Sequence, residues 1–306
     1  MKQLKIYCTI YVSVFISVLS AQTKSDTSLT TLLRSYIGSF KGDVGMYVHN
    51  LESGASVEIN ADSLFPTASM IKVPIMVAIM DKVEKGELKY DSLLVYRDSL
   101  AYPGDDIIAS LKDSATIELS KVQMLSMTTS DNTGSLWLQQ LAGTGTRINE
   151  IMEHLGLNYT RMNSRTPGRE EMWKKYGWGV TTPREMAELV VRLYRGKVVS
   201  PWASERMFRN MSRSYWDGEA LSEIPPYIHV ASKQGAVNES RSEVVLVNAP
   251  HGAYVFCVIT KNQQDTSWTN DNDGFVLLRK VSRTLWHHFE PDDHWNPYKE
   301  SLELYH

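Results

Sequence analysis

"FPTASMIKVPIM", residues 65–76, places a serine and a lysine three positions apart at the start of an apolar run. Residues 66–68 are typical of a turn, and the apolar stretch 70–80 predicts a helix. Ser69 and Lys72 would then lie one helical turn apart on the same face. A lysine desolvated there has a lowered pKa and can take a proton from a neighbouring hydroxyl. The competing interpretation is a lysine that extends to solvent beside an ordinary serine, because the pattern S-x-x-K alone is common.

Residues 1–21 are expected to be a secretory signal peptide. Two lysines open the segment, an apolar core follows, and small residues end it at Ala21, where cleavage is expected. Cys8 lies inside the apolar core rather than at the cleavage point, so a lipid anchor is not expected. No later stretch is long and apolar enough to span a membrane. The chain is therefore expected to be exported, secreted or periplasmic, with no membrane anchor.

Charge and cysteine content restrict the class of partner. Removing residues 1–21 takes away two lysines and no acids, so the formal net charge falls from −3 to −5. An acidic chain without basic runs argues against a nucleic-acid partner. Cys257 then remains as the only cysteine, inside an apolar strand where core packing is its expected role. "HHFEPDDH", residues 287–294, resembles a ligand cluster, but the proline break separates its side chains, so neither a metal nor a cofactor is expected. A monomer is expected.

Strand-like alternation appears at both ends of the chain, with helical periodicity between them. The expected strands lie in residues 43–53, 55–60, 227–235, 242–250 and 252–260. The expected helices are Thr27–Tyr36, Ser69–Lys85, Ser120–Met127, Thr133–Leu141, Thr146–Leu155, Pro183–Arg195 and Gly274–Phe289. This order predicts an α/β (α+β) fold in one domain, residues 22–306. Residues 22–65 and 213–306 would form an antiparallel sheet flanked by terminal helices, and residues 66–212 an all-helical part.

Two further short motifs bear on the role of Ser69. "TTSDNTG" carries Ser130, Asp131 and Asn132 between two predicted helices, and "VASKQGAVNESRS" carries Lys233 near the end of a predicted strand. Taken singly, the first is an ordinary turn and helix cap, and the second an exposed strand end. Their occurrence together, in this order after S-x-x-K, favours one shared active site.

With these motifs the chain resembles the penicillin-recognising serine enzymes, and within them the class A β-lactamases, whose signature is S-x-x-K, S-D-N and K-T-G. The likeness covers nearly the whole mature chain and includes "TTP" at residues 181–183 before a helix. "YPGDDIIASL", residues 102–111, and the K-x-G-x5-R spacing look closest to a branch often labelled serine hydrolase. The resemblance implies a two-subdomain β-lactamase/transpeptidase-like fold and acyl-enzyme chemistry on a small-molecule substrate.

The resemblance also implies catalytic roles that the chemistry can justify. Ser69 would attack a strained or activated carbonyl and form an acyl-enzyme. Lys72 is the candidate base. Ser130 would pass a proton to the leaving nitrogen, and Lys233 would keep the surroundings of that hydroxyl electropositive.

A second set of residues is implied to bind the substrate. Asn132 would offer its amide, and the backbone N–H groups of Ser69 and Ala236 would form an oxyanion hole. Gln234 and Gly235 complete the strand-end motif. Arg241, eight residues after Lys233, could bind a substrate carboxylate as a planar fork. The competing interpretation of Arg241 is a surface arginine paired with Glu239 or Glu243.

The chain departs from the family pattern at the deacylating acid. Class A β-lactamases carry a glutamate in a loop that reads R-x-x-R-x-E-x-x-L-N, and this acid activates the deacylating water. In "RMNSRTPGRE", residues 161–170, that position is Thr166, the second arginine is Ser164, and the asparagine is Glu170. Gln234 also replaces the threonine of K-T-G.

Glu170 could restore the missing acid. If residues 166–170 are helical, positions 166 and 170 share a face, which would bring the carboxylate to the same water. The competing interpretation is an exposed helix on which Glu170 pairs with Lys174 and Glu171 with Lys175.

The leading hypothesis is an exported serine hydrolase that is acylated on Ser69 by a β-lactam or a related amide or ester. Hydrolysis of the acyl-enzyme is expected to be slow because Thr166 replaces the glutamate. The alternatives are a D-Ala-D-Ala-type peptidase or esterase, and a penicillin-binding sensor that is acylated without turnover.

Overall fold

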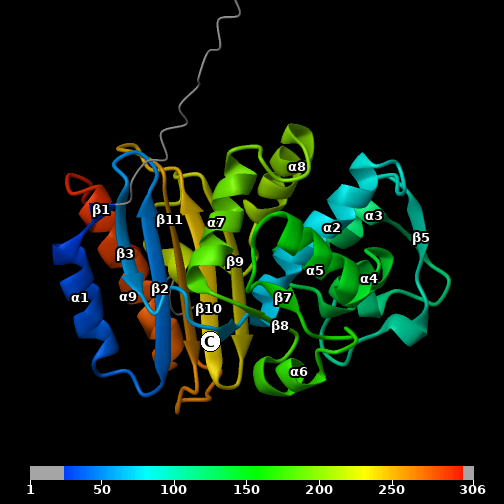
Figure 1. The fold of residues 1–306 in the computed structure, drawn as a ribbon, viewed down its shortest axis with the longest axis horizontal. Helices are drawn as coiled ribbons and strands as arrows, with labels where there is room; N and C mark the ends of the chain where they lie inside the picture. The colour runs from blue at the N-terminus through cyan, green and yellow to red at the C-terminus, as the bar shows by residue number, and fades with distance from the viewer. Residues whose placement is uncertain (1–23, 299–306) are drawn as a thin grey trace, which may run out of the picture.

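The computed structural model describes residues 24–298 of the chain. The expected signal peptide and Cys8 lie outside these residues. A sheet of six strands runs through one half of the molecule, in the order β1-β3-β2-β11-β10-β9 (Figure 1). Its strands are β1 (Lys24–Ser25), β2 (Asp43–Asn50), β3 (Ala55–Ile59), β9 (Val230–Val237), β10 (Ser240–Val247) and β11 (Tyr254–Lys261).

The two ends of the chain meet at the centre of this sheet. Strand β2 pairs antiparallel with β11, with Tyr47 opposite Cys257, so the expectation that both termini build one sheet is confirmed. Cys257 is buried in the core as expected. The sheet is antiparallel as expected, except at one edge, where the two-residue strand β1 pairs parallel with β3.

Helices cover both faces of the sheet. α1 (Thr27–Ile37) and α9 (Asp273–Phe289) lie on one face, and α7 (Pro183–Tyr194) contacts β2, β10 and β11 on the other (Figure 1). The alternation along β10 explains this arrangement, since successive side chains point to opposite faces. Val245 and Val247 join the core under α9, whereas Val244 and Leu246 join the core under α7.

The remaining helices form the other half of the molecule (Figure 1). They are α2 (Lys72–Glu84), α3 (Leu119–Thr128), α4 (Asn132–Leu141), α5 (Thr144–His154), α6 (Glu170–Tyr176) and α8 (Pro201–Met211). Two small sheets accompany them: β4 (Phe65–Pro66), β8 (Gly179–Thr181) and β7 (Arg161–Met162) in one, β5 (Leu93–Val95) and β6 (Thr116–Glu118) in the other. Among residues 24–298, no helix is both long and apolar enough to cross a membrane.

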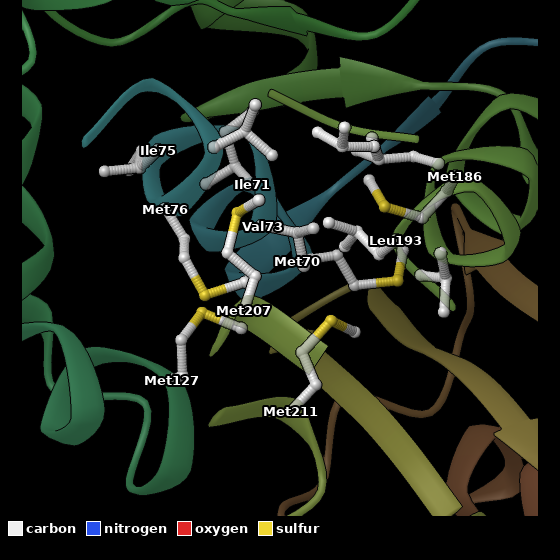
Figure 2. Close-up of a cluster of buried hydrophobic side chains, with 14 of the residues drawn as sticks. Met70, Ile71, Val73, Ile75, Met76, Met127, Met186, Leu193, Met207 and Met211 are labelled. Atoms are coloured by element: carbon white, nitrogen blue, oxygen red, sulfur yellow. The ribbon is translucent and has the colours of Figure 1, made fainter. Parts of the chain in front are cut away.

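The first turns of α2 are held in a methionine-rich core. Every residue of α2 from Lys72 to Met80 is buried. Figure 2 shows the side chains that surround this segment, drawn from the turn before α2 and from α2, α3, α7 and α8: Met70, Ile71, Val73, Ile75, Met76, Met127, Met186, Leu193, Met207 and Met211. Flexible thioether side chains fill irregular gaps of this kind. The backbone that carries residues 69–72 is therefore fixed from several sides.

Three local features differ from the expected elements. The helix expected from Ser69 begins as a 3₁₀ turn, η1 (Ala68–Ile71), and becomes α-helical at Lys72. Helix α8 was not among the expected helices, although Ser200 caps it and Pro201 occupies its first turn. Residues 166–169 are not helical, since α6 begins at Glu170.

Candidate active site

The turn that carries Ser69 is pressed against the edge strand of the main sheet. Ala68 has φ +43°, a left-handed conformation that costs energy for a residue with a side chain. A β-carbon on Gly235 of β9 would lie 2.9 Å from the backbone nitrogen of Ser69. A glycine is thus required where β9 approaches η1 so closely.

Lys72 is buried below this turn, with 1% of its surface exposed. Its ammonium donates hydrogen bonds to Ser130 Oγ at 2.9 Å, to Asn132 Oδ1 at 2.8 Å and to the Ser130 carbonyl. Burial lowers the pKa of Lys72 to about 7, although the carboxylates of Asp106 and Asp131 oppose the shift. Near neutral pH a substantial fraction of Lys72 is therefore a neutral amine, which can accept a proton.

Lys233 reaches the same hydroxyl from β9. Its ammonium donates to Ser130 Oγ at 3.1 Å, to the Gln234 carbonyl at 2.9 Å and to Gln234 Oε1. Burial and the positive charge of Lys72 hold the pKa of Lys233 well below its usual value, against the carboxylates of Glu243 and Glu219. Two amines thus converge on the Ser130 hydroxyl.

The loop that carries Ser130 is fixed by two carboxylates. Ser130 itself has φ +60°. Asp131 caps α4 by accepting from the Gly134 backbone N–H at 2.7 Å, and its other oxygen accepts from Ile108. Asp106 accepts from the backbone N–H groups of Asn132 and Thr133 at 2.9 and 2.6 Å. These bonds at a helix N-terminus, where negative charge is favourable, lock Ser130 and Asn132 in place.

A cavity of about 640 Å³ opens in front of this group. Ser69, Asn132 and Ala236 line it, as expected for residues that meet a substrate. Aromatic and charged residues form a large part of its remaining wall: Tyr102, Lys175, Tyr176, Trp178, Glu239, Lys261 and Trp268. Ser69 and Asn132 therefore line the cavity. Lys72, Ser130 and Lys233 lie behind its lining, linked to Asn132 through the hydrogen bonds of Lys72 and Ser130.

Thr166 does not reach this cavity. It is buried, its hydroxyl donates to the Ser164 carbonyl at 3.0 Å, and it is not among the residues that line the cavity. A β-carbon on Gly145 of α5 would lie 1.7 Å from Thr166 Oγ1. The Thr166 side chain therefore points to α5.

Glu170 is not brought to the site either. It is exposed at the start of α6, and its carboxylate accepts from the Gly168 backbone N–H at 3.1 Å. The helical geometry expected to align it with Thr166 does not exist, because Arg165 and Gly168 both have positive φ. The expected pairs are also different, since Lys174 binds Glu171 at 2.7 Å rather than Glu170.

Arg241 is neither a surface arginine nor a wall of the cavity. It is fully buried, and its guanidinium donates to the carbonyls of Val237, Ser240 and Ser267. It pairs with neither Glu239 nor Glu243; Glu243 instead accepts from Ser232 Oγ and the Ala220 N–H. Arg241 therefore does not present the planar fork to the cavity that was expected to bind a substrate carboxylate.

The sequence interpretation missed several residues of the site. Asp106 and Tyr102 lie in the stretch 102–111, which was singled out only for its resemblance. Tyr102 packs edge-on against Trp178 with ring centres 5.4 Å apart, and Trp268 lines the cavity from the loop before α9. A rule that flags aromatic residues near Gly or Pro loops would have found Tyr102, but no local signal places Trp268.

No group of three or more His, Cys, Asp or Glu side chains gathers as a metal ion would require among residues 24–298.

Comparison with known proteins gives consistent matches. A model of the β-lactamase enzyme family matches residues 27–289. β-Lactamase VEB-1 of Pseudomonas aeruginosa is 22% identical over 261 residues, covering 80% of this chain and 85% of that protein.

Solved structures share the fold. The structure of PBP-A matches with a TM-score of 0.78 and 27% identity, covering 88% of this chain and 98% of that chain. A PBP-A mutant solved as an acyl-enzyme complex with penicillin G matches with the same values. A β-lactamase from Sphaerobacter thermophilus matches with a TM-score of 0.77 and 23% identity, covering 86% of this chain and 98% of that one.

Proposed function

The chain belongs to the β-lactamase enzyme family, and on that premise we propose that it is an exported serine hydrolase acylated on Ser69 by β-lactams or related amides and esters. Family membership makes it a serine β-lactamase-like hydrolase. The finer assignment depends on one observation. The Ser130 hydroxyl accepts hydrogen bonds from two buried lysines, Lys72 at 2.9 Å and Lys233 at 3.1 Å.

This arrangement supports an acylation step. The neutral amine of Lys72 takes the proton of Ser69 as its oxygen attacks the carbonyl carbon. Backbone N–H groups of Ser69 and Ala236, which both line the cavity, are proposed to stabilise the oxyanion. The bond between carbonyl carbon and leaving atom then breaks.

Ser130 is proposed to protonate the leaving group. Because both lone pairs of its oxygen are engaged by ammonium donors, the hydroxyl has only its proton to offer. It passes that proton to the leaving nitrogen or oxygen and is resupplied by the proton that Lys72 took from Ser69. Asn132, which also holds Lys72, is proposed to contact the acyl side chain.

Deacylation is proposed to be slow. The position of the family's acid is Thr166, whose side chain faces α5, and Glu170 is exposed. A positioned general base typically contributes about 10²- to 10⁴-fold. A second candidate function follows from the same observation: a penicillin-binding protein that is acylated and stalls. The acyl-enzyme complex of a PBP-A mutant with penicillin G supports this second function.

One experiment tests the proposal and separates these two functions. The purified protein is mixed with a chromogenic cephalosporin while intact mass and colour are followed, with Ser69→Ala as control. A Ser69 adduct with a burst and slow turnover supports the slow hydrolase. An adduct without turnover supports the stalled protein. A Ser69→Ala variant that forms the same adduct would refute Ser69 as nucleophile.

A further inference from the structure

We propose that the natural acyl donor carries no carboxylate beside its scissile bond and instead places an uncharged apolar or aromatic group on the indole of Trp268. This inference rests on the proposed acylation of Ser69 and narrows its substrate class. A carboxylate beside the scissile bond would have to pair with Arg241 or Lys233. The inference follows because the hydrogen-bond donors of both side chains are already used within the protein or buried.

The guanidinium of Arg241 is closed off from the cavity. Val237 and Ser240 line the cavity, but both turn their carbonyls to Arg241 Nη1, and Ser267 takes Nη2. The side chain has 0% of its surface exposed. Its Nε–H is buried and has no hydrogen-bond partner among the described residues, so it is not presented to the cavity either.

Two aromatic rings lie close to this guanidinium. Its central carbon lies 4.6 Å from the ring centre of Trp268 and 4.7 Å from that of Phe275. The stem is packed from below by α9, since a β-carbon on Gly274 would lie 2.6 Å from Arg241 Cγ. Arginine stacks on aromatic faces in this way. The surface that the cavity receives is therefore the indole of Trp268, which is 60% exposed.

The second cation is also saturated. The three N–H donors of the Lys233 ammonium go to Ser130 Oγ, the Gln234 carbonyl and Gln234 Oε1. The side chain of Gln234 thus occupies a donor that a shorter threonine would leave for a ligand. The three donors of Lys72 are likewise used by Ser130 and Asn132. A carboxylate entering here would meet no available ammonium hydrogen on either lysine.

The other charged residues on the cavity wall do not form a preorganised anion-binding site. Lys261 donates to the Leu64 carbonyl at 2.9 Å and lies over the Phe65 ring. Lys175 is exposed on α6, and Glu239 adds a negative charge to the same wall. An uncharged group stacked on Trp268 avoids the cost of desolvating a carboxylate without a partner.

The test uses a matched pair of probes, benzylpenicillin and its methyl ester. The rate of Ser69 acylation per unit concentration is measured by intact mass for each probe. Each rate is divided by that probe's own rate of alkaline hydrolysis, which removes the difference in intrinsic reactivity. We expect the wild-type protein to show no preference for the free acid, so that the normalised rate for the methyl ester equals or exceeds that for benzylpenicillin.

Two variants test separately whether Arg241 and Lys233 can bind a carboxylate once their donors become accessible. Trp268→Ala uncovers one face of Arg241, and Gln234→Thr releases one donor of Lys233. We expect each to favour the free acid by about tenfold relative to wild type, because a charge-assisted hydrogen bond then becomes available. Trp173→Ala is the matched control, since Trp173 is also exposed but lies on α6 away from the cavity lining. It should leave the ratio unchanged.

The outcomes separate this inference from the proposed function. If wild-type protein prefers the free acid tenfold or more, through Arg241, Lys175 or Lys261, the inference is overturned while acylation of Ser69 stands. If Trp268→Ala and Gln234→Thr both keep the wild-type ratio, the closed cations do not set specificity and the inference is also overturned. If neither probe modifies Ser69, the proposed function and the inference fall together.

Discussion

The hydroxyl of Thr166 fills the space beside Gly145, so that a β-carbon on Gly145 would lie 1.7 Å from Thr166 Oγ1. This contact joins the loop after β7 to the first turn of α5. It determines the direction of residue 166, which points into the helical half of the molecule and not to the cavity. Thr166, which the sequence resemblance matches to the deacylating acid of class A β-lactamases, thus makes a packing contact here.

Gly145→Ala should destabilise the protein by about 1–3 kcal/mol, because the added methyl overpacks the site against Thr166. Intrinsic helix propensity alone favours alanine by about 1 kcal/mol. The sign of the change in unfolding free energy therefore shows whether overpacking or helix propensity dominates. Urea unfolding measures the change. Gly38→Ala is the control, since its β-carbon would meet only backbone atoms at 3.7 and 3.9 Å. In a double-mutant cycle, Thr166→Gly should make Gly145→Ala less costly; additive effects would contradict direct contact.

Glu170→Gln should leave the lifetime of the Ser69 acyl-enzyme unchanged. The carboxylate is exposed and bound to the Gly168 N–H, so it is not positioned to activate a water at the ester. The decay of the adduct, followed by intact mass after removal of free penicillin, measures this lifetime. Glu171→Gln, which breaks only the exposed pair with Lys174, is the matched control. A lifetime prolonged tenfold or more by Glu170→Gln alone would assign the base to Glu170.

The rate of Ser69 acylation should rise with pH through about 7 and then level off. The reason is that Lys72 must be neutral to act as base, and its pKa is lowered to about 7. Asp106→Asn removes a negative charge that favours the ammonium form, so the midpoint of the profile should move to lower pH. Asp105→Asn, on the exposed neighbour, should not move it. A midpoint that stays in place in Asp106→Asn would show that Lys72 does not control the profile.

Stability should fall as pH rises from about 5 to 7, and Glu243→Gln should reduce this fall. Burial, with the nearby carboxylate of Glu219, raises the pKa of Glu243 to about 8. The folded chain therefore holds a proton that the unfolded chain loses near pH 4.5, so this contribution is complete below that pH and is lost as pH rises through about 8. Urea midpoints across this range measure it. Glu239→Gln, on an exposed residue, should keep the wild-type slope, and an equal slope in Glu243→Gln would refute the assignment.

Local periodicity was sufficient to predict the main sheet and most helices, because β2 and β11 are long and nearly every residue in them is buried. It was insufficient for the two small sheets. Their strands have two or three residues, and pairing between distant segments holds them, as where Phe65 meets Thr181. A strand of two or three residues is too short to show the alternation of apolar and polar residues from which a strand is predicted.

In the candidate site, too, features carried by local sequence could be predicted, whereas features fixed by distant segments could not. Ser69, Lys72, Ser130 and Lys233 could be grouped from motifs because Lys72 and Lys233 lie on a helix and a strand, and Ser69 and Ser130 lie in the short turns just before α2 and α4. The burial of Arg241 could not be predicted, since its cover comes from Trp268 and Phe275, far along the chain. Glu170 was misplaced because helical spacing was assumed across a loop whose Arg165 and Gly168 have left-handed backbones.

The pairing of β2 with β11 also sets the order in which the molecule can be assembled. Without β11, the sheet order leaves β1-β3-β2 and β10-β9 as two separate pieces. A chain emerging from the ribosome therefore cannot close its sheet until β11 (Tyr254–Lys261) has been made. Pairing between such distant segments is intrinsically slow. A chain truncated before Tyr254 would leave β2 and β10 as bare edges, which invite pairing with other chains. Aggregation of such fragments is a direct consequence of this topology.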